Sequence, residues 1–553
     1  MLDNQMTGHI PVMLILIAII ACAVVFLSIK SKNRADQRII DAFGKIPECE
    51  GNDLGPLKAY HRYALTEERN HPLIDNLTWN DLNMDAVFQR INVCVSSVGE
   101  EYLYYILHDL QTCKSKLENR ERLLQWLEDN PDARLKLQKI LHGIGKSKGN
   151  GLSSYLFRAE AKKLKNSWVY PIMALLPIVG LALFPLFPGV GATLGISAAC
   201  INSVIYHRTS IFLESDLESV RYFSALLYGA KSINKKFDSM LGSIGFGLKE
   251  ALKPYKRIGG LLPGKSQQLM SEMETFFLLF KTIFLVDLLR YNRTVDVMIK
   301  HSRELNEMYK IVGEIDAAIC ILSYRHSLEY YCLPKFHDSN TVNFAEVFHP
   351  LLNKPVANSG RIGNDSIITG SNASGKSTFI KTIAINHILA QTIYTCCAKR
   401  YELGFSYVVS SMAVRDDILA GESYFVAEVK SLKRVIEYCS TRRCVCFIDE
   451  ILRGTNTPER IAASTAILKM LHETESLCMV ASHDIELTEI LADIYDNYHF
   501  SETFENDLIE FDYLLKIGPS QSTNAVKLLK YMGFEKRIVD EATALLDNRN
   551  KGN

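Results

Sequence analysis

The sequence predicts three kinds of structure. An α/β domain with a parallel-rich sheet should fill the C-terminal part, an all-α domain should precede it, and three transmembrane helices should interrupt the rest. From about residue 340, short apolar runs alternate with helical stretches, as a parallel sheet with crossover helices requires. Before that point, apolar residues recur every three or four positions over 77–145 and 210–335, which indicates helices.

Composition sets the broad class of protein. The chain has 553 residues, of which 48% are hydrophobic and 22% are charged, so it is neither disordered nor a collagen nor a small disulfide scaffold. Lys and Arg number 62, as do Asp and Glu, so any surface for nucleic acid must be local. The 13 cysteines form no paired framework, which favours reduced thiols in the cytosol.

The first transmembrane helix is expected at residues 10–29, which carry no charge and are long enough to cross a bilayer. Lys30, Lys32 and Arg34 follow, so the positive-inside rule places the N-terminus outside and the following chain in the cytosol. A cleaved signal peptide is the alternative. It is disfavoured because no Lys or Arg precedes the apolar run.

A second uncharged run covers residues 168–206. Prolines and glycines at its middle predict a hairpin of two helices, at about 168–185 and 189–206. Lysines precede the run and Arg208 follows it, so both ends should be cytosolic. A hairpin buried in a soluble core is the alternative. The expected localisation is therefore the cell membrane, with several spans, the bilayer as partner and the C-terminal domain in the cytoplasm.

The strongest chemical signal follows the apolar strand 367–369. Residues 370–377 fit G-x-x-x-x-G-K-[ST], and an amphipathic helix comes next. Such a loop turns backbone amides and a helix N-terminus toward phosphate oxygens. Lys376 should bridge the β- and γ-phosphates of ATP, and Ser377 should bind Mg²⁺. The predicted ATP-binding residues are Gly370, Ser371, Asn372, Ala373, Ser374, Gly375, Lys376, Ser377 and Thr378.

Two further strands supply candidate catalytic groups. The run 444–450 ends in Asp449, a predicted Mg²⁺ partner, and Glu450, the predicted general base for the attacking water. The run 477–481 is followed by His483, which can contact the γ-phosphate. A histidine at a strand end would by itself be an ordinary surface residue. Lys376, Glu450 and His483 make the predicted catalytic set, and Ser377 and Asp449 are the predicted Mg²⁺ ligands.

These motifs together resemble the MutS family of DNA mismatch-repair ATPases. Residues 369–378 are similar to its TGPN-x-x-GKST, with Ser371 in place of proline. Residues 416–428 resemble DD-x-x-x-G-x-S-x-F-x-x-E, and residues 449–455 resemble DE-x-x-RGT. Residues 482–487 are similar to T-H-x-x-E-L.

The resemblance covers about residues 340–545 and, more weakly, the helical parts before it. It implies an ABC-type P-loop ATPase fold and a homodimer with composite sites, in which Ser423 reaches the nucleotide of the partner subunit. A helix N-cap is the plainer role for Ser423. The resemblance also implies double-stranded DNA as a partner and a C-terminal helical dimerisation element.

The sequence departs from the family at its N-terminal side. Mismatch-repair members begin with a domain that inserts a Phe-x-Glu wedge, whereas this chain begins with a membrane segment. The tripeptides at 344–346 and 500–502 fit the wedge pattern but lie within or beside the ATPase region. We therefore expect a membrane-anchored variant that lacks the mismatch-recognition domain.

The expected function is that of a DNA clamp driven by ATP. An ABC-type motor that acts on a membrane partner or in transport is the alternative, although it predicts more spans and an LSGGQ-like signature. A scaffold that uses ATP only as a switch is disfavoured by Glu450. The predicted domains are an N-terminal anchor (1–35), a first helical-core part (36–165), a transmembrane hairpin (166–208), a second helical part (209–338), the ATPase (339–515) and a dimerisation element (516–553).

Overall fold

The computed structural model divides the chain into two compact units. Unit 1 comprises Met1–Arg69, Asn92–Tyr105 and Leu123–His326, and unit 2 comprises Asn70–Ile91, Ile106–Arg122 and Ser327–Asn553. The structure describes residues 37–47, 54–67, 73–147, 151–157, 164, 166–238, 240–256, 279–371, 374–412, 424–505, 508–520, 529 and 532–550. The predicted first transmembrane helix lies outside them.

Unit 1 is built from helices, as the apolar spacing predicts. Besides parts of α5 and α6, its main helices are α2 (Ala59–Glu67), α7 (Pro131–Ile144), α8 (Leu152–Leu156), α9 (Val169–Leu183), α10 (Pro188–Phe212), α11 (Glu214–Phe237), α12 (Ser243–Leu252), α14 (Val286–Lys300) and α15 (Ser302–His326). Helix α15 is buried over most of its length. Its Asp316 accepts hydrogen bonds from the amide (3.0 Å) and hydroxyl (2.5 Å) of Ser96. Burial raises the pKa of Asp316 to about 6.

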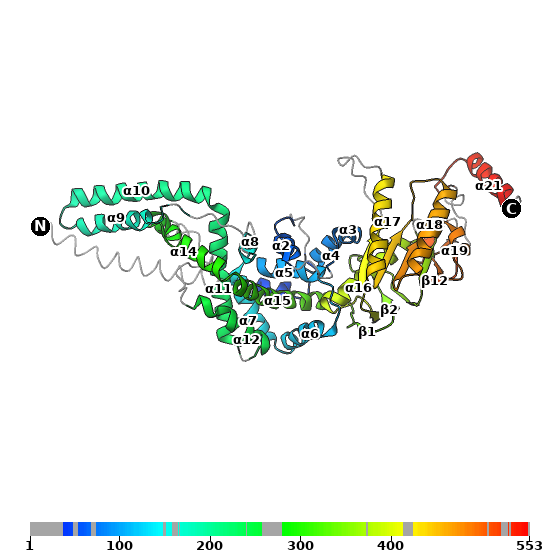
Figure 1. Cartoon of the computed structure of the whole chain (residues 1–553), viewed down its shortest axis with the longest axis horizontal. Coiled ribbons are helices and arrows are strands. Elements are labelled where there is room, and N and C mark those ends of the chain that lie inside the picture. The colour runs from blue at the N-terminus through cyan, green and yellow to red at the C-terminus, as the bar shows by residue number, and fades with distance from the viewer. Residues whose placement is uncertain are drawn as a thin grey trace. The chain divides into compact units, whose positions relative to one another are not determined.

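Helices α9 and α10 form the expected hairpin and run side by side (Figure 1). Glycines let them approach closely, since a Cβ on Gly180 would lie 2.5 Å from the amide nitrogen of Gly195. Among the described helices, only α10 is long and apolar enough to cross a membrane, whereas α9 has 15 residues. The prediction of three transmembrane helices is therefore not supported, because one of the two hairpin helices is too short.

Unit 2 contains the predicted α/β domain. Its six-stranded sheet has the order β12-β9-β4-β8-β7-β6 and is parallel except for the edge strand β12. The strands of this sheet are β4 (Ser366–Thr369), β6 (Tyr407–Ser411), β7 (Cys444–Asp449), β8 (Leu477–Ala481), β9 (Asp496–His499) and β12 (Lys516–Ile517). Their near-continuous apolar burial is typical of parallel strands covered on both faces.

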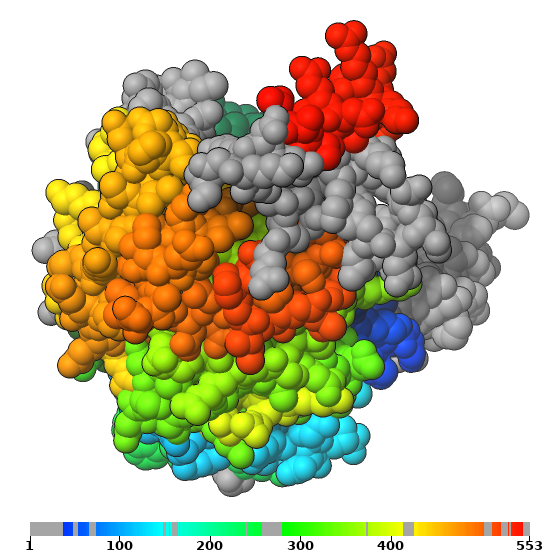
Figure 2. All heavy atoms as spheres, turned by 90° about the vertical axis from the view of Figure 1, so that its right-hand side faces the viewer, coloured from blue at the N-terminus to red at the C-terminus, as the bar shows by residue number. Residues whose placement is uncertain are grey.

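The remaining elements of unit 2 surround this sheet. A four-stranded sheet has the order β1-β5-β2-β3, and β10 pairs with β11. These strands are β1 (Lys335–His337), β2 (Val342–Val347), β3 (Asn358–Ile362), β5 (Arg400–Gly404), β10 (Glu502–Glu505) and β11 (Leu508–Phe511). The helices are α3 (Asn76–Asp81), α4 (Met84–Ile91), α16 (Lys376–Ile393), α17 (Tyr424–Thr441), α18 (Thr457–His472), α19 (Ile485–Ile490) and α21 (Lys536–Asn550). Figure 2 shows α18 and α19 in orange on the face toward the viewer.

Helices α5 (Ser97–His108) and α6 (Lys114–Asp129) contribute residues to both units. The short helix α3 belongs to unit 2, although the sequence places it in the first helical part. It covers the open edge of β6. Asp81 accepts hydrogen bonds from the amide of Met412 (3.0 Å) and the hydroxyl of Ser410 (2.7 Å). Thr78 accepts one from the amide of Ser410 (3.1 Å). These contacts satisfy edge amides that no strand pairs.

We expect Asp81→Ala to destabilise unit 2 by about 2–3 kcal/mol, because it leaves buried donors on Ser410 and Met412 without their acceptor. Hydrogen exchange of the peptide that covers β6 should speed up more than that of β7. As a control, Asp129→Ala replaces an exposed residue and should change the free energy of unfolding by no more than about 0.5 kcal/mol. Unchanged protection of β6 in the Asp81 variant would contradict this account of the edge.

Candidate functional site

The phosphate-loop motif forms the turn between β4 and α16. Gly370 and Gly375 adopt φ values of +139° and +100°, which other residues rarely reach. A Cβ on Gly370 would lie 2.6 Å from the carbonyl oxygen of Phe500, so a side chain has no room there. The turn aims the N-terminus of α16 at the loop, and such a helix end attracts anions. Asn372 and Ala373 lie outside the described residues.

Lys376 lies inside this turn and is 3% exposed. Its Nζ donates to the carbonyl oxygens of Gly370 (2.5 Å) and Ser371 (2.9 Å) and lies 3.3 Å from Nε2 of His483. Desolvation lowers the pKa of Lys376 to about 8, against the opposing attraction of Glu450 and Asp449. A cation held in a desolvated loop is suited to bind a phosphate group.

Asp449 ends β7 beside the start of α16. Its carboxylate accepts a hydrogen bond from Ser377, and burial raises its pKa in spite of that bond. Among the described residues, nothing donates to its buried Oδ1 atom. A carboxylate oxygen and a hydroxyl fit Mg²⁺, which takes one or two protein ligands and completes its shell with phosphate and water oxygens. No cluster of three or more His, Cys, Asp or Glu side chains in the described ranges could hold a metal.

Glu450 follows at the mouth of the site. Its Oε1 lies 2.9 Å from Nε2 of His483, and its Oε2 lies 3.0 Å from Nη1 of Arg453. The hydrogen bond from His483 is the main reason why its pKa is lowered. The residue has φ +57°, and its amide donates to the carbonyl of Ala481 at the end of β8 (2.9 Å). The carboxylate is therefore ionised at neutral pH and can accept a proton from water.

Glu428 on α17 holds the loop after Glu450 in place. It accepts a hydrogen bond from the amide of Arg453 (3.2 Å) and further backbone bonds from Leu452 and Gly454. Leu452 has φ +55°, so the loop is strained. In the sequence, Glu428 is the last position of the motif at residues 416–428, and no role could be predicted for it. Only the fold reveals this role, because β7 separates α17 from the loop in the sequence and the two meet only in the folded chain.

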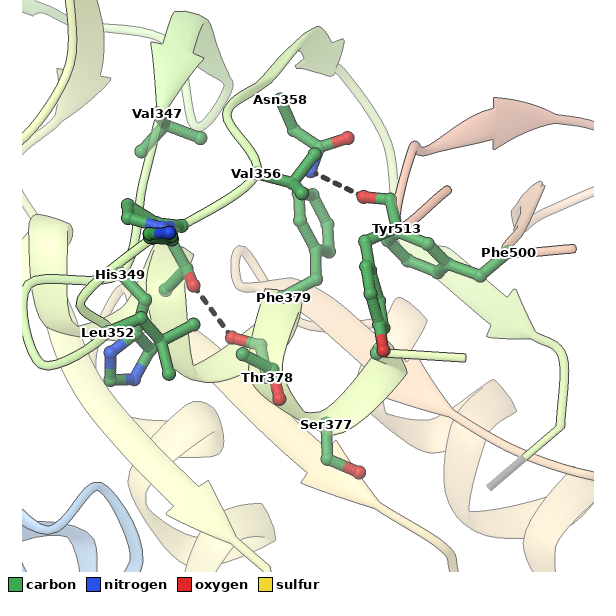
Figure 3. A pocket seen from close by; sticks show the side chains of 14 residues that line it. Val347, His349, Leu352, Val356, Asn358, Ser377, Thr378, Phe379, Phe500 and Tyr513 are labelled. Atoms are coloured by element: carbon green, nitrogen blue, oxygen red, sulfur yellow. Dashed lines mark hydrogen bonds between the residues drawn. The ribbon is translucent and has the colours of Figure 1, made fainter. Parts of the chain in front are cut away.

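A pocket of about 390 Å³ adjoins the phosphate loop. Figure 3 shows His349, Leu352 and Val356 on one side of it and Tyr513 on the other, with Ser377 and Thr378 at its floor. Burial lowers the pKa of His349 to about 4, so the ring is neutral, and its Nδ1 accepts from the amide of Leu351 (3.2 Å). The lining combines apolar and aromatic side chains with polar ones, Lys354 among them, and such a mixture fits an aromatic base and a sugar. The sequence predicted Gly375, Ser377 and Thr378 of this lining as ATP-binding residues, but it gave no binding role to the other lining residues.

The fold gathers most of the predicted site. Lys376, Ser377, Asp449, Glu450 and His483 come from two strand ends and one helix start and meet at the same edge of the sheet. Ser423 lies outside the described residues, so the structure does not place it. The individual roles of these residues stay predictions.

Comparison with known proteins finds relatives of the α/β domain in unit 2. Residues 366–549 match the family model described as MutS domain V. The DNA mismatch repair protein MutS of Lactobacillus helveticus is 31% identical over 230 residues, which are 39% of this chain and 27% of that protein.

Two further relatives agree. The protein of the same name from Thermus thermophilus is 28% identical over 254 residues, 45% of this chain and 31% of the relative. The one from Natronomonas pharaonis is 28% identical over 256 residues, 44% and 30% of the two chains. The chain thus spans less than a third of the length of these curated relatives.

We expect Glu450→Gln to bind ATP as tightly as the parent chain and to hydrolyse it about 10²–10⁴-fold more slowly, because the amide cannot accept a proton from water. Single-turnover hydrolysis and equilibrium binding of labelled ATP separate the two effects. Glu473→Gln, an exposed change of the same kind, serves as control. If Glu450→Gln kept full turnover, another group would be the base.

We expect Glu428→Ala to lower kcat by about 10- to 100-fold while KM for ATP stays within error, since it frees the loop that aims Glu450. Glu428→Gln keeps a carbonyl acceptor and should restore part of the rate. Glu437→Ala, on the exposed face of the same helix, should behave like the parent. An equal rise of KM in the Glu428 variants would point to lost folding or binding instead.

Proposed function

Because this chain belongs to the MutS family, we propose that it binds ATP with Mg²⁺ at the phosphate loop and hydrolyses it as a homodimer. The observation that carries the proposal is the meeting of Lys376, Asp449 and Glu450 at one edge of the parallel sheet. This edge is where α/β proteins bind their ligands.

Each residue has a chemical task in this reaction. Lys376 leaves the loop carbonyls and neutralises the β- and γ-phosphates, and Ser377 and Asp449 hold Mg²⁺, which would balance charge on the transferred phosphoryl group. Glu450 takes a proton from the attacking water. His483 orients Glu450 through its 2.9 Å contact and lies near enough to the lysine to approach the γ-phosphate. The adjoining pocket takes the adenosine part.

Exposed apolar residues support the dimer. Phe425, Val426 and Val429 are 38%, 44% and 43% exposed at the start of α17, directly after the predicted partner-facing Ser423. Helix α21 likewise exposes Ile538 and Leu545 (Figure 2, red). Surfaces of this kind are typical of protein contacts. In the proposed dimer, the first set would lie over the nucleotide of the partner subunit and the second would join the C-terminal ends.

We also propose that the dimer closes on double-stranded DNA. The relatives are named as DNA mismatch repair proteins, and the matched region is their ATPase. The apolar hairpin favours a second candidate, an ABC-type motor that acts on a partner in the membrane. The proposed location is the cell membrane with the ATPase in the cytoplasm. DNA dependence and mismatch recognition separate the two candidates.

If DNA is the partner, duplex DNA should stimulate ATP hydrolysis and bind with an affinity that falls steeply between about 50 and 200 mM salt. Detergent-purified protein, assayed with homoduplex, mismatched and branched DNA, provides the measurement. The Glu450→Gln variant should retain DNA binding without turnover. Absence of both stimulation and salt-dependent binding would reject the DNA clamp and leave the membrane motor.

A further inference from the structure

The hairpin of α9 and α10 carries an inference about how the protein meets the membrane. We propose that it enters the bilayer from the cytoplasmic side and returns without crossing, so that its turn stays within the hydrocarbon. This rests on the proposed membrane location and differs from a pair of spanning helices. Four features of the hairpin support it, namely its outer surface, its turn, its length and its inner contacts.

The outer surface of the hairpin fits lipid better than a protein partner. Residues 168–206 carry no charge, and only 22% of the most apolar window of α10 is buried. At about 100° per residue, the exposed apolar positions cover roughly half the circumference of each helix. They are Ile172, Leu175, Ile178 and Leu181 on α9, and Val190, Ile196, Ile201, Val204, Ile211 and Phe212 on α10. A protein partner would cover the exposed apolar surface on one side of the two helices, whereas lipid would cover that surface on every side.

The turn is as apolar as the helices. Phe184, Leu186, Phe187 and Val190 are 50%, 74%, 60% and 62% exposed, and residues 183–190 contain no polar side chain. A hairpin that crossed the membrane would place this cluster in water on the far side. Within the hydrocarbon the same side chains are in a favourable medium.

Part of the turn's backbone is satisfied without water. Pro185 and Pro188 have no N–H group to satisfy. The amides of Leu186 and Phe187 both donate to the carbonyl of Leu183, at 3.1 and 2.9 Å. Internal satisfaction of this kind is what a bilayer interior demands of a peptide chain.

The length of the hairpin agrees with a shallow position. Helix α9 has 15 residues, which at about 1.5 Å each give about 22 Å, less than the roughly 30 Å of a hydrocarbon core. Trp168 precedes α9 and is 68% exposed, and lysines lie just before it in the sequence. Tryptophan and lysine prefer the interface, so the hairpin enters at this point. Its turn then lies short of the opposite interface.

The amide side chain of Asn202 faces the inside of the hairpin, whereas the small hydroxyl residues Thr193 and Ser197 are exposed on α10. Asn202 is fully buried, and its Nδ2 donates to the carbonyl oxygens of Met173 (2.9 Å) on α9 and Ile283 (2.8 Å) in the segment before α14. Glycines at 180, 191 and 195 form the close contact between the helices. In lipid, small residues and interhelical hydrogen bonds hold helices together. Burial of apolar side chains does not, because they are as stable against lipid tails as against another helix.

A cysteine placed in the turn tests the proposal in the full chain. Leu186→Cys and the matched control His207→Cys, at the base of α10, are made in a Cys113→Ser background, because Cys113 is exposed. Intact spheroplasts and inside-out vesicles are treated with a membrane-impermeant maleimide before and after detergent. The background chain, measured in parallel, gives the labelling of the other cysteines.

We expect the turn cysteine to react only after detergent and the base cysteine to react from the cytoplasmic side. The native Cys200, exposed midway along α10, should match the turn. Labelling of Leu186→Cys from outside would show a spanning hairpin and overturn the proposal while membrane location stands. Labelling from the cytoplasmic side before detergent would show that the hairpin does not insert. Recovery of the parent chain in the soluble fraction would instead reject the membrane location.

Discussion

The sharp turn from β4 into α16 is the constraint on which the site depends. Only glycine fits at Gly370, where the carbonyl of Phe500 fills the space that a Cβ would need. That turn brings Lys376 within reach of the loop carbonyls and of His483 at the end of β8. Since β4 lies between β9 and β8, and β7 adjoins β8, the carboxylates of the neighbouring strand end within reach of the same helix start. The turn and the sheet order together create the candidate site.

The carboxylate side of the candidate site contains two strained residues, and backbone contacts hold them in place. Glu450 and Leu452 both have positive φ values, which L-residues adopt only when the surroundings enforce them. Ala481 fixes the backbone before the strained stretch, and Glu428 fixes the backbone after it. A carboxylate on such a support moves little, so its direction is set before any ligand binds. Helix α17, which carries Glu428, begins immediately after Ser423, so a partner that displaced this helix would also change the support of Glu450.

Local sequence predicted the parts of the site that lie within one motif. The phosphate loop, the Asp449-Glu450 pair and His483 each follow an apolar strand, so their placement at one sheet edge could be inferred from the α/β pattern. The contacts that cross the chain could not. Asp81 and Ser410 are 329 residues apart, and no periodicity in either segment indicates that they meet. The pocket beside Ser377 likewise combines residues from β2, the loop before β3 and the region after β11, which only the folded sheets bring together.

The hairpin shows that the lengths of its helices, and not composition alone, decide how many times it can cross a membrane. An uncharged run of 39 residues predicts two spans, yet the prolines that make the turn also shorten α9 to 15 residues. Helix α10 passes into α11 with only Leu213 between them, and Asp287 of α14 binds both Tyr206 (3.0 Å) and Arg221 (2.7 Å) at this junction. The base of the hairpin is thus joined to the rest of unit 1 by a continuous chain and an ion pair in which Asp287 is buried and Arg221 is partly exposed. Rotation of α11 would therefore turn the hairpin with it, and a hairpin that ends inside the bilayer can move in this way without carrying any polar group across the membrane.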